Sequence, residues 1–138
     1  DSISVDQTEQ IPGALKQLSS RVDALWLLRD ARVMSRAFFE QTMLLQYNRK
    51  LPVLAYSPQF VKKGAVASCA ADYESQGRMA AKLSRAILGG QSPAEMGIVS
   101  PDGTLYVNSE AAKQAGIELD ATMLKREDVK VVGGKGGR

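Results

Sequence analysis

The residue types in this sequence restrict the catalytic chemistry that the chain could perform. It has no His and a single Cys, Cys69, among 138 residues. Without His there is no Ser-His or Cys-His nucleophile pair and no His-containing zinc site. Cys69 lies in a run of small residues with no His to activate its thiol, so we interpret it as a buried structural thiol. The sequence therefore predicts that the chain is not an enzyme, and it predicts no metal site and no cofactor.

The polar side chains best placed to bind a ligand each follow a short apolar run. Asp30 follows 24–28, Ser57 follows 53–56, and Asp72 with Tyr73 follows 66–70. In an open parallel sheet, ligands bind beyond the carboxyl ends of the strands, where backbone groups and helix N-termini converge. We therefore expect these side chains at one edge of a sheet. The alternative is that Asp30, Ser57 and Asp72 only cap the helices that they precede.

Aromatic side chains lie near these polar positions in the sequence. Tyr56 and Phe60 flank Ser57, and Tyr73 follows Asp72 directly. Small-molecule sites combine apolar or stacking walls with a few placed polar groups. The sequence thus predicts ligand contacts from Tyr56, Phe60 and Tyr73 as well as from the polar residues.

The elements that must position these residues alternate between strand and helix. Uninterrupted apolar runs at 24–28 and 53–56 predict strands covered on both faces by helices. Further strands are expected at 3–5, 65–70, 104–107 and 128–132, and helices at 7–20, 33–50, 58–61, 72–88, 109–115 and 120–125. This alternation favours an α/β fold, a three-layer sandwich with a mostly parallel sheet.

Charge and terminal composition argue against nucleic acid and phosphate binding. Lys and Arg total 18 and Asp and Glu total 15, and the basic residues are scattered, so no nucleic-acid surface is predicted. Lys135 lies in a Gly-rich tail, 133–138, that superficially resembles a phosphate-binding loop. Such a loop must open a helix and carry Ser or Thr after the Lys. We therefore expect one folded unit over 1–132 and a disordered tail over 133–138.

The chain begins at Asp1 without Met and without the basic start or apolar core of a signal peptide. No window approaches the roughly 18 apolar residues that a membrane-spanning helix needs. We expect a preceding segment to have been processed off or left out.

Several segments, taken in order, carry a family resemblance. They are 21–30, 51–57, 60–66, 72–78 with 80–81, 87–90 and 107–117. The ordered set resembles the uncharacterised ABC-transporter substrate-binding proteins of the type I periplasmic-binding-protein class, and it spans about 11 to 132.

The resemblance implies a Rossmann-like lobe of a bilobed solute receptor, periplasmic or lipid-anchored, that delivers a small molecule to an ABC permease. Relatives bind amino acids, including aromatic ones. Because the chain has about half the expected length, it resembles the C-terminal lobe with segments that cross the hinge. The matching positions of Asp30, Ser57, Asp72 and Tyr73 line or border the cleft.

Two further expectations follow from the resemblance. If a missing lobe covers part of this one, the isolated chain should expose a surface near Tyr73, Gly77 and Ala80 and self-associate. The same fold also serves in extracytoplasmic ligand-sensing domains of membrane signalling proteins. A neighbouring permease and ATPase gene would favour transport, whereas a downstream membrane helix with a kinase or cyclase domain would favour sensing.

Overall fold

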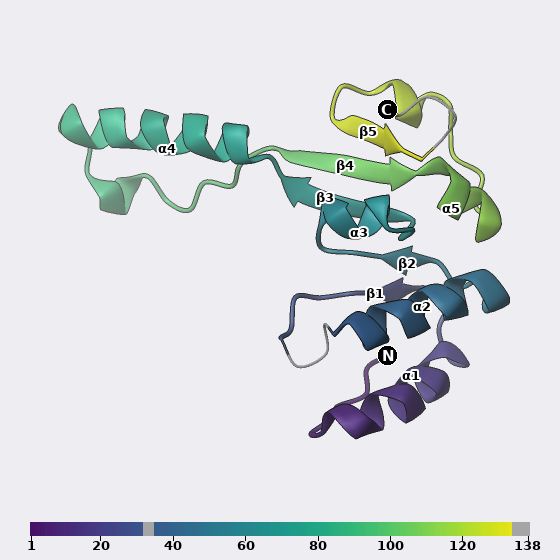
Figure 1. Cartoon of the computed structure of the whole chain (residues 1–138). Helices are drawn as coiled ribbons and strands as arrows, with labels where there is room; N and C mark the ends of the chain where they lie inside the picture. Colours follow the sequence, from purple (N-terminus) through teal and green to yellow (C-terminus); the bar gives the residue numbers. More distant parts are fainter. Residues whose placement is uncertain (32–34, 134–138) are drawn as a thin grey trace.

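The computed structural model describes residues 1–31 and 35–133 (Figure 1). The helices are η1 (Thr8–Gln10), α1 (Ile11–Ser19), α2 (Arg36–Arg49), α3 (Pro58–Lys62), α4 (Tyr73–Leu88), η2 (Pro93–Glu95), α5 (Ser109–Gln114) and η3 (Met123–Lys125). The strands are β1 (Leu25–Trp26), β2 (Val53–Leu54), β3 (Ala67–Ala71), β4 (Gly103–Asn108) and β5 (Val129–Val132). Within this part of the chain, no helix is long and apolar enough to cross a membrane.

The strands form one sheet in the order β1-β2-β3-β4-β5. β1 pairs in parallel with β2, with Leu25 opposite Val53, and β2 pairs in parallel with β3. β4 runs antiparallel to β3, and β5 is parallel to β4. The predicted α/β fold with a mostly parallel sheet is confirmed, and so is the parallel pairing of the two strands that the apolar runs identified.

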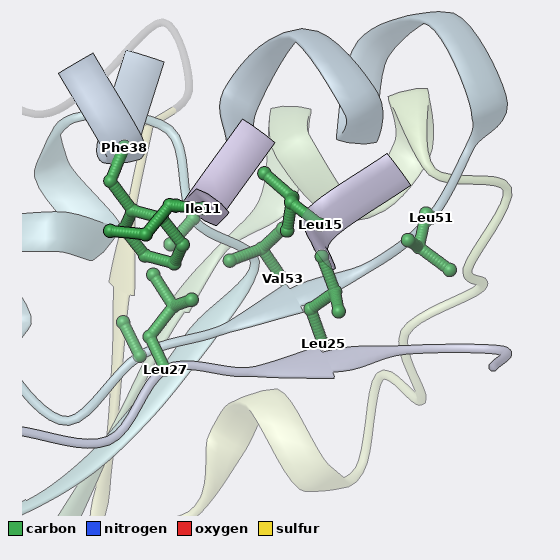
Figure 2. Close-up of a cluster of buried hydrophobic side chains, with 9 residues drawn as sticks. Ile11, Leu15, Leu25, Leu27, Phe38, Leu51 and Val53 are labelled. Atoms are coloured by element: carbon green, nitrogen blue, oxygen red, sulfur yellow. The ribbon is translucent and has the colours of Figure 1, made fainter. Parts of the chain in front are cut away.

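The main core lies between β1, β2 and the helices α1 and α2. Leu25, Leu27 and Val53 point toward Ile11 and Leu15 of α1, and Phe38 of α2 packs beside them (Figure 2). Leu25 and Leu27 are two residues apart, so both point to the same face of the sheet. Their burial among aliphatic side chains positions the carboxyl ends of β1 and β2.

The opposite face of β1 and β2 departs from the sequence-based prediction. Trp26 is 72% exposed and Leu54 is 38% exposed, and the two residues are partners in the parallel register. The apolar runs therefore alternate between a buried and an exposed face, so the prediction that helices cover both faces was wrong at these strands. An apolar run alone cannot show whether its second face is covered.

α4 is a projecting arm rather than a helix packed on the sheet. It leaves the end of β3 and extends away from the other elements, and residues 89–102 return beside it to β4 (Figure 1). It has no buried residue. Its boundaries and its N-cap, Asp72, agree with the prediction, because capping is a local interaction that needs no tertiary contact.

The remaining sequence-based expectations are met in part. The helix expected at 109–115 and the terminal strand expected at 128–132 are confirmed as α5 and β5. Cys69, expected to be buried, is exposed. The strand expected at 3–5 is wrong, since this segment carries no strand hydrogen bonds. Most of the tail expected to be disordered, 134–138, and the start of the helix expected at 33–50 lie outside the described residues.

Candidate functional site

The carboxyl ends of β1, β2 and β3 lie at one edge of the sheet because the three strands are parallel. β3 extends four residues beyond the position where it pairs with Leu54, from Ala67 to Ala71, or about 13 Å at the rise of an extended strand. The end of β3 therefore reaches past β2 and starts the α4 arm (Figure 1). This edge is the candidate site.

Ser57 lies at the β2 end of this edge and caps α3. Its side chain accepts a hydrogen bond from the backbone N–H of Gln59 at 3.4 Å. Pro58 follows at the first helical position, where its fixed φ suits a helix start. The capping interpretation thus describes the geometry of Ser57, and the hydroxyl keeps a second lone pair and its proton for another partner.

Tyr56 and Phe60 are brought together, and a third ring joins them. The Tyr56 and Phe60 centroids are 5.2 Å apart in an edge-on arrangement. Phe39 of α2 lies 4.9 Å from Phe60. The prediction omitted Phe39, although the Phe38-Phe39 pair near the start of α2 indicated that one ring would face the core and the other a different neighbour. The three rings give this end of the edge an apolar wall.

Asp72 and Tyr73 lie at the other end of the edge, where β3 meets α4. The carboxylate of Asp72 accepts hydrogen bonds from the backbone N–H groups of Glu74 and Ser75, both at 3.4 Å. Tyr73 is 88% exposed. Asp72 is thus committed to capping α4 in this conformation, whereas the Tyr73 ring is accessible to a ligand or another surface.

Asp30 follows β1 and is exposed. The pairing of β1 continues for one residue past Trp26, since the Leu27 N–H donates to the Leu54 carbonyl at 2.8 Å. Asp30 lies three residues further along, on the segment that leads toward α2. That Asp30 lies close to Ser57 on this edge stays a prediction.

Ser57→Ala is expected to lower the free energy of unfolding by about 1 kcal/mol, because α3 would lose its cap. α3 carries Val61, which is fully buried, so its fraying should affect the whole fold. Urea denaturation of Ser20→Ala, which also removes a local hydroxyl contact at a helix end, is the matched control. Equal stability of Ser57→Ala and the wild type would contradict the capping role.

The carboxyl groups with a lowered pKa lie elsewhere, in the segment that joins α5 to β5. Hydrogen bonds from the Thr122 hydroxyl and backbone lower the pKa of Asp120. A hydrogen bond from the Arg126 guanidinium lowers the pKa of Asp128. Both carboxylates are exposed, so these contacts order the segment before β5 and are screened by salt.

Metal ligation is not a feature of the described edge. Across 1–31 and 35–133, no group of three or more His, Cys, Asp or Glu side chains could hold a metal ion. One polar group that the sequence did not single out is the Ser68 hydroxyl on β3, which is buried without a protein partner in this part of the chain.

One protein family matches this chain over almost its whole length. The family described as ABC transporter substrate binding protein matches residues 1–131. A curated relative, a tyrosine-binding protein of Clostridioides difficile, is 24% identical over 128 residues, which cover 93% of this chain and 36% of that protein.

Solved structures show the same fold. A conserved domain protein from Vibrio cholerae is 25% identical with a TM-score of 0.63, over 94% of this chain and 43% of that one. The ligand-free, open structure of a substrate-binding protein with adhesive properties from Clostridium difficile is 23% identical with a TM-score of 0.71. The match covers 95% of this chain and 43% of that one. An ABC domain in complex with L-Trp from Streptococcus pneumonia is 24% identical with a TM-score of 0.66. The match covers 96% of this chain and 44% of that one. The chain thus spans less than half the length of each of these proteins.

Proposed function

Because the chain belongs to the ABC transporter substrate-binding protein family, we propose that the carboxyl edge of β1, β2 and β3 forms one wall of a cleft for a small molecule. The observation that carries this proposal is the shared edge of three parallel strands, with Ser57, the Tyr56–Phe60 ring pair and Asp72 around it. Binding rather than catalysis is the activity of this family.

The proposed ligand is an amino acid, with an aromatic side chain as the first class to test. A curated relative is a tyrosine-binding protein, and one structural neighbour was solved in complex with L-Trp. In this proposal Asp30 and Ser57 hold the polar end of the ligand, and Tyr56, Phe60 and Tyr73 contact its apolar part. A ring offset-stacked or edge-on to an aromatic ligand contributes about 1 kcal/mol beyond simple burial.

The chain acts in this proposal as one lobe, 1–132, corresponding to the C-terminal half of a two-lobe receptor. A second lobe would supply the opposite wall, and an ABC permease in the membrane would receive the solute. The protein would therefore work outside the cytoplasm, in the periplasm or on a lipid anchor. One wall alone should bind weakly, because closure of two walls buries most of a ligand's surface.

The test is a nuclear magnetic resonance titration of the 138-residue chain with L-Trp and L-Tyr. Shifts are expected at millimolar ligand in residues 27–30, 55–60 and 71–73. Asp30→Ala should weaken binding about ten- to hundredfold if its carboxylate pairs with the ligand's ammonium group, as expected of a charge-assisted hydrogen bond. The measured quantity is the dissociation constant from the shift curves.

The matched control is Asp23→Ala, the same substitution just before β1, at the opposite end of the strand. It should leave the dissociation constant unchanged. An unchanged dissociation constant for Asp30→Ala would exclude Asp30 from the site. Ligand-induced resonance shifts confined to other parts of the sheet would exclude it as well. If Asp30 only caps a helix, its substitution should instead cost about 1 kcal/mol of stability with affinity intact.

A further inference from the structure

Asp102 is the one Asp in this sequence that a Gly follows. In such a dipeptide the backbone nitrogen of the second residue can attack the side-chain carboxyl carbon of the Asp and close a cyclic succinimide. A following Gly has no side chain to hinder this approach, and it permits the backbone conformations that ring closure needs. Asp102 and Gly103 are both exposed. The dipeptide therefore has the chemistry of a site of spontaneous modification.

The strand register directs the backbone N–H of Gly103 away from β3. The Leu105 N–H donates to the Asp128 carbonyl at 2.8 Å, on the side of β4 where β5 lies. Gly103 precedes Leu105 by two residues, so its N–H points to the same side. The pairing with β5 begins only at Leu105, opposite Val129. In the described part of the chain, therefore, no strand holds the nitrogen of Gly103 in a ladder hydrogen bond.

Packing against β3 requires a Gly at position 103. A Cβ at this position would lie 3.0 Å from the Cys69 Sγ, which is inside the optimal separation of two non-bonded atoms. Gly103 is also the last partner in the ladder between β3 and β4, opposite Ala71. The end of a ladder opens locally at a lower free energy than its centre. Such opening lets the carboxyl group of Asp102 reach the Gly103 nitrogen.

The other side chain with similar chemistry is restrained by the fold. Asn108 precedes the small residue Ser109, but its amide accepts from the Ala111 N–H and donates to the Val61 carbonyl, and it is 8% exposed. These contacts keep its side-chain carbonyl carbon away from the next backbone nitrogen. Among the described residues, by contrast, no hydrogen bond or ion pair holds the Asp102 carboxylate. The structure thus favours reaction at Asp102.

We propose that Asp102 isomerises to isoaspartate through a succinimide, and that this change lengthens the main chain where the α4 arm rejoins the sheet (Figure 1). The Gly103 nitrogen bonds to the side-chain carboxyl carbon of Asp102, and the carboxyl hydroxyl leaves with the amide proton as water. Water then opens the ring. Attack at the side-chain carbonyl restores Asp, whereas attack at the main-chain carbonyl breaks the original peptide bond and routes the main chain through the side-chain methylene.

The isoaspartyl chain is longer by one carbon–carbon bond, about 1.5 Å, just before the Ala71–Gly103 pair. The reaction consumes only water and involves no oxidation or reduction. It needs no solute, so it can fail or succeed independently of the proposed function.

Prolonged incubation of the 138-residue chain in water labelled with heavy oxygen tests the proposal. Peptide mass spectrometry should find isoaspartate at position 102, with one heavy oxygen incorporated for each ring opening. Asp23 and Asp120 are exposed and precede Ala, so they serve as internal controls. They should isomerise about tenfold less, because the Cβ of the following residue hinders ring closure.

A pair of variants tests the role of the glycine. Cys69→Ala removes the Sγ that a Cβ at position 103 would meet, and alone it should leave isomerisation unchanged. Gly103→Ala in the Cys69→Ala background should lower isomerisation of Asp102 by about tenfold. Circular dichroism checks that both variants are folded.

Amide hydrogen exchange measures the effect on the sheet. The register directs the Thr104 N–H at Ala70, next to the inserted methylene. This N–H should exchange severalfold faster in the isoaspartyl form than in the unmodified chain. The Asn108 N–H donates to the Val66 carbonyl at 2.8 Å at the other end of the same ladder, and its exchange should be unchanged.

The following results would overturn the proposal. Absence of isoaspartate at position 102, or an equal amount at Asp23, excludes a selective reaction. Undiminished isomerisation after Gly103→Ala shows that the glycine does not control it. Equal exchange of the Thr104 N–H in the two forms shows that the sheet is unaffected. If Asp102 is protected in a longer polypeptide that contains this chain, the modification is not a property of that protein.

Discussion

Gln46→Ala is expected to lower the free energy of unfolding by about 3 kcal/mol. The Gln46 side chain is 4% exposed and bridges two backbone segments. Its Nε2 donates to the Gly64 carbonyl at 2.7 Å, and its Oε1 accepts from the Val53 N–H at 3.0 Å. Truncation leaves the buried Val53 N–H and the half-buried Gly64 carbonyl without their partner, and an orphaned buried group costs about 1 to 3 kcal/mol.

Urea denaturation monitored by circular dichroism measures this loss. Gln17→Ala, the same substitution on the exposed side of α1, is the control and should change stability by less than about 0.5 kcal/mol. Gln46→Glu adds a sharper test. Its ionised side chain keeps the acceptor for Val53 but has no donor for Gly64, whereas its protonated side chain can donate its O–H there. Its stability relative to the wild type should therefore rise as the pH falls. Equal losses in Gln17→Ala and Gln46→Ala would contradict the bridging role.

Asn108→Ala is expected to destabilise the fold by about 2 to 3 kcal/mol. Asn108 is 8% exposed. Its Oδ1 accepts from the Ala111 N–H at 2.9 Å and so caps α5, while its Nδ2 donates to the Val61 carbonyl at 3.0 Å. The loss combines about 1 kcal/mol for the cap with about 1 kcal/mol for the buried hydrogen bond to the Val61 carbonyl, which keeps only the Gly64 N–H as a donor.

Asn108→Ser separates the two contributions, because Ser keeps a capping oxygen but is too short to reach Val61. Its stability should lie between those of the wild type and Asn108→Ala in the same urea experiment. Asn48→Ala, at an exposed position near the end of α2, serves as the control. Identical stabilities of the Ser and Ala variants would show that only the contact with Val61 matters.

Local chemistry in the sequence predicted much of this fold. The first residues of α4 and α5 are set by the N-caps Asp72 and Asn108. The side chain of each cap accepts hydrogen bonds from backbone N–H groups two or three residues further along the chain. The parallel pairing of β1 and β2 follows from two apolar runs separated by a helix. The caps depend on interactions within a few residues, and the parallel pairing depends on a single helix that joins the two strands.

The antiparallel pairing of β3 and β4 could not be predicted in the same way. A helix between two strands usually packs on the sheet and returns the chain for a parallel crossover. Here the helix leaves the sheet, and Ala71 pairs with Gly103. The apolar spacing of α4 is the same whether its face meets a sheet or solvent, so the sequence pattern does not distinguish the two arrangements.

The candidate site was predictable to a similar extent. Strand ends identify its edge, but the contribution of Phe39 and the bridge made by Gln46 depend on how α2 is rotated over β2. Gln46 follows Thr42 by one helical turn on the buried side, so spacing could have indicated its burial. A buried amide is favourable only when partners in the folded chain satisfy it, and spacing does not reveal those partners.

The topology of the α4 arm has a consequence for chain entropy. Residues 72–102 depart from and return to adjacent positions of an antiparallel pair, Ala71 and Gly103, which a two-residue hairpin could join. Closing a loop of about thirty residues instead of about four costs roughly 2 kcal/mol of conformational entropy. The sheet would therefore gain stability if a tight turn replaced the arm. The residues of the arm can offset this entropic cost only through contacts that they make outside the sheet.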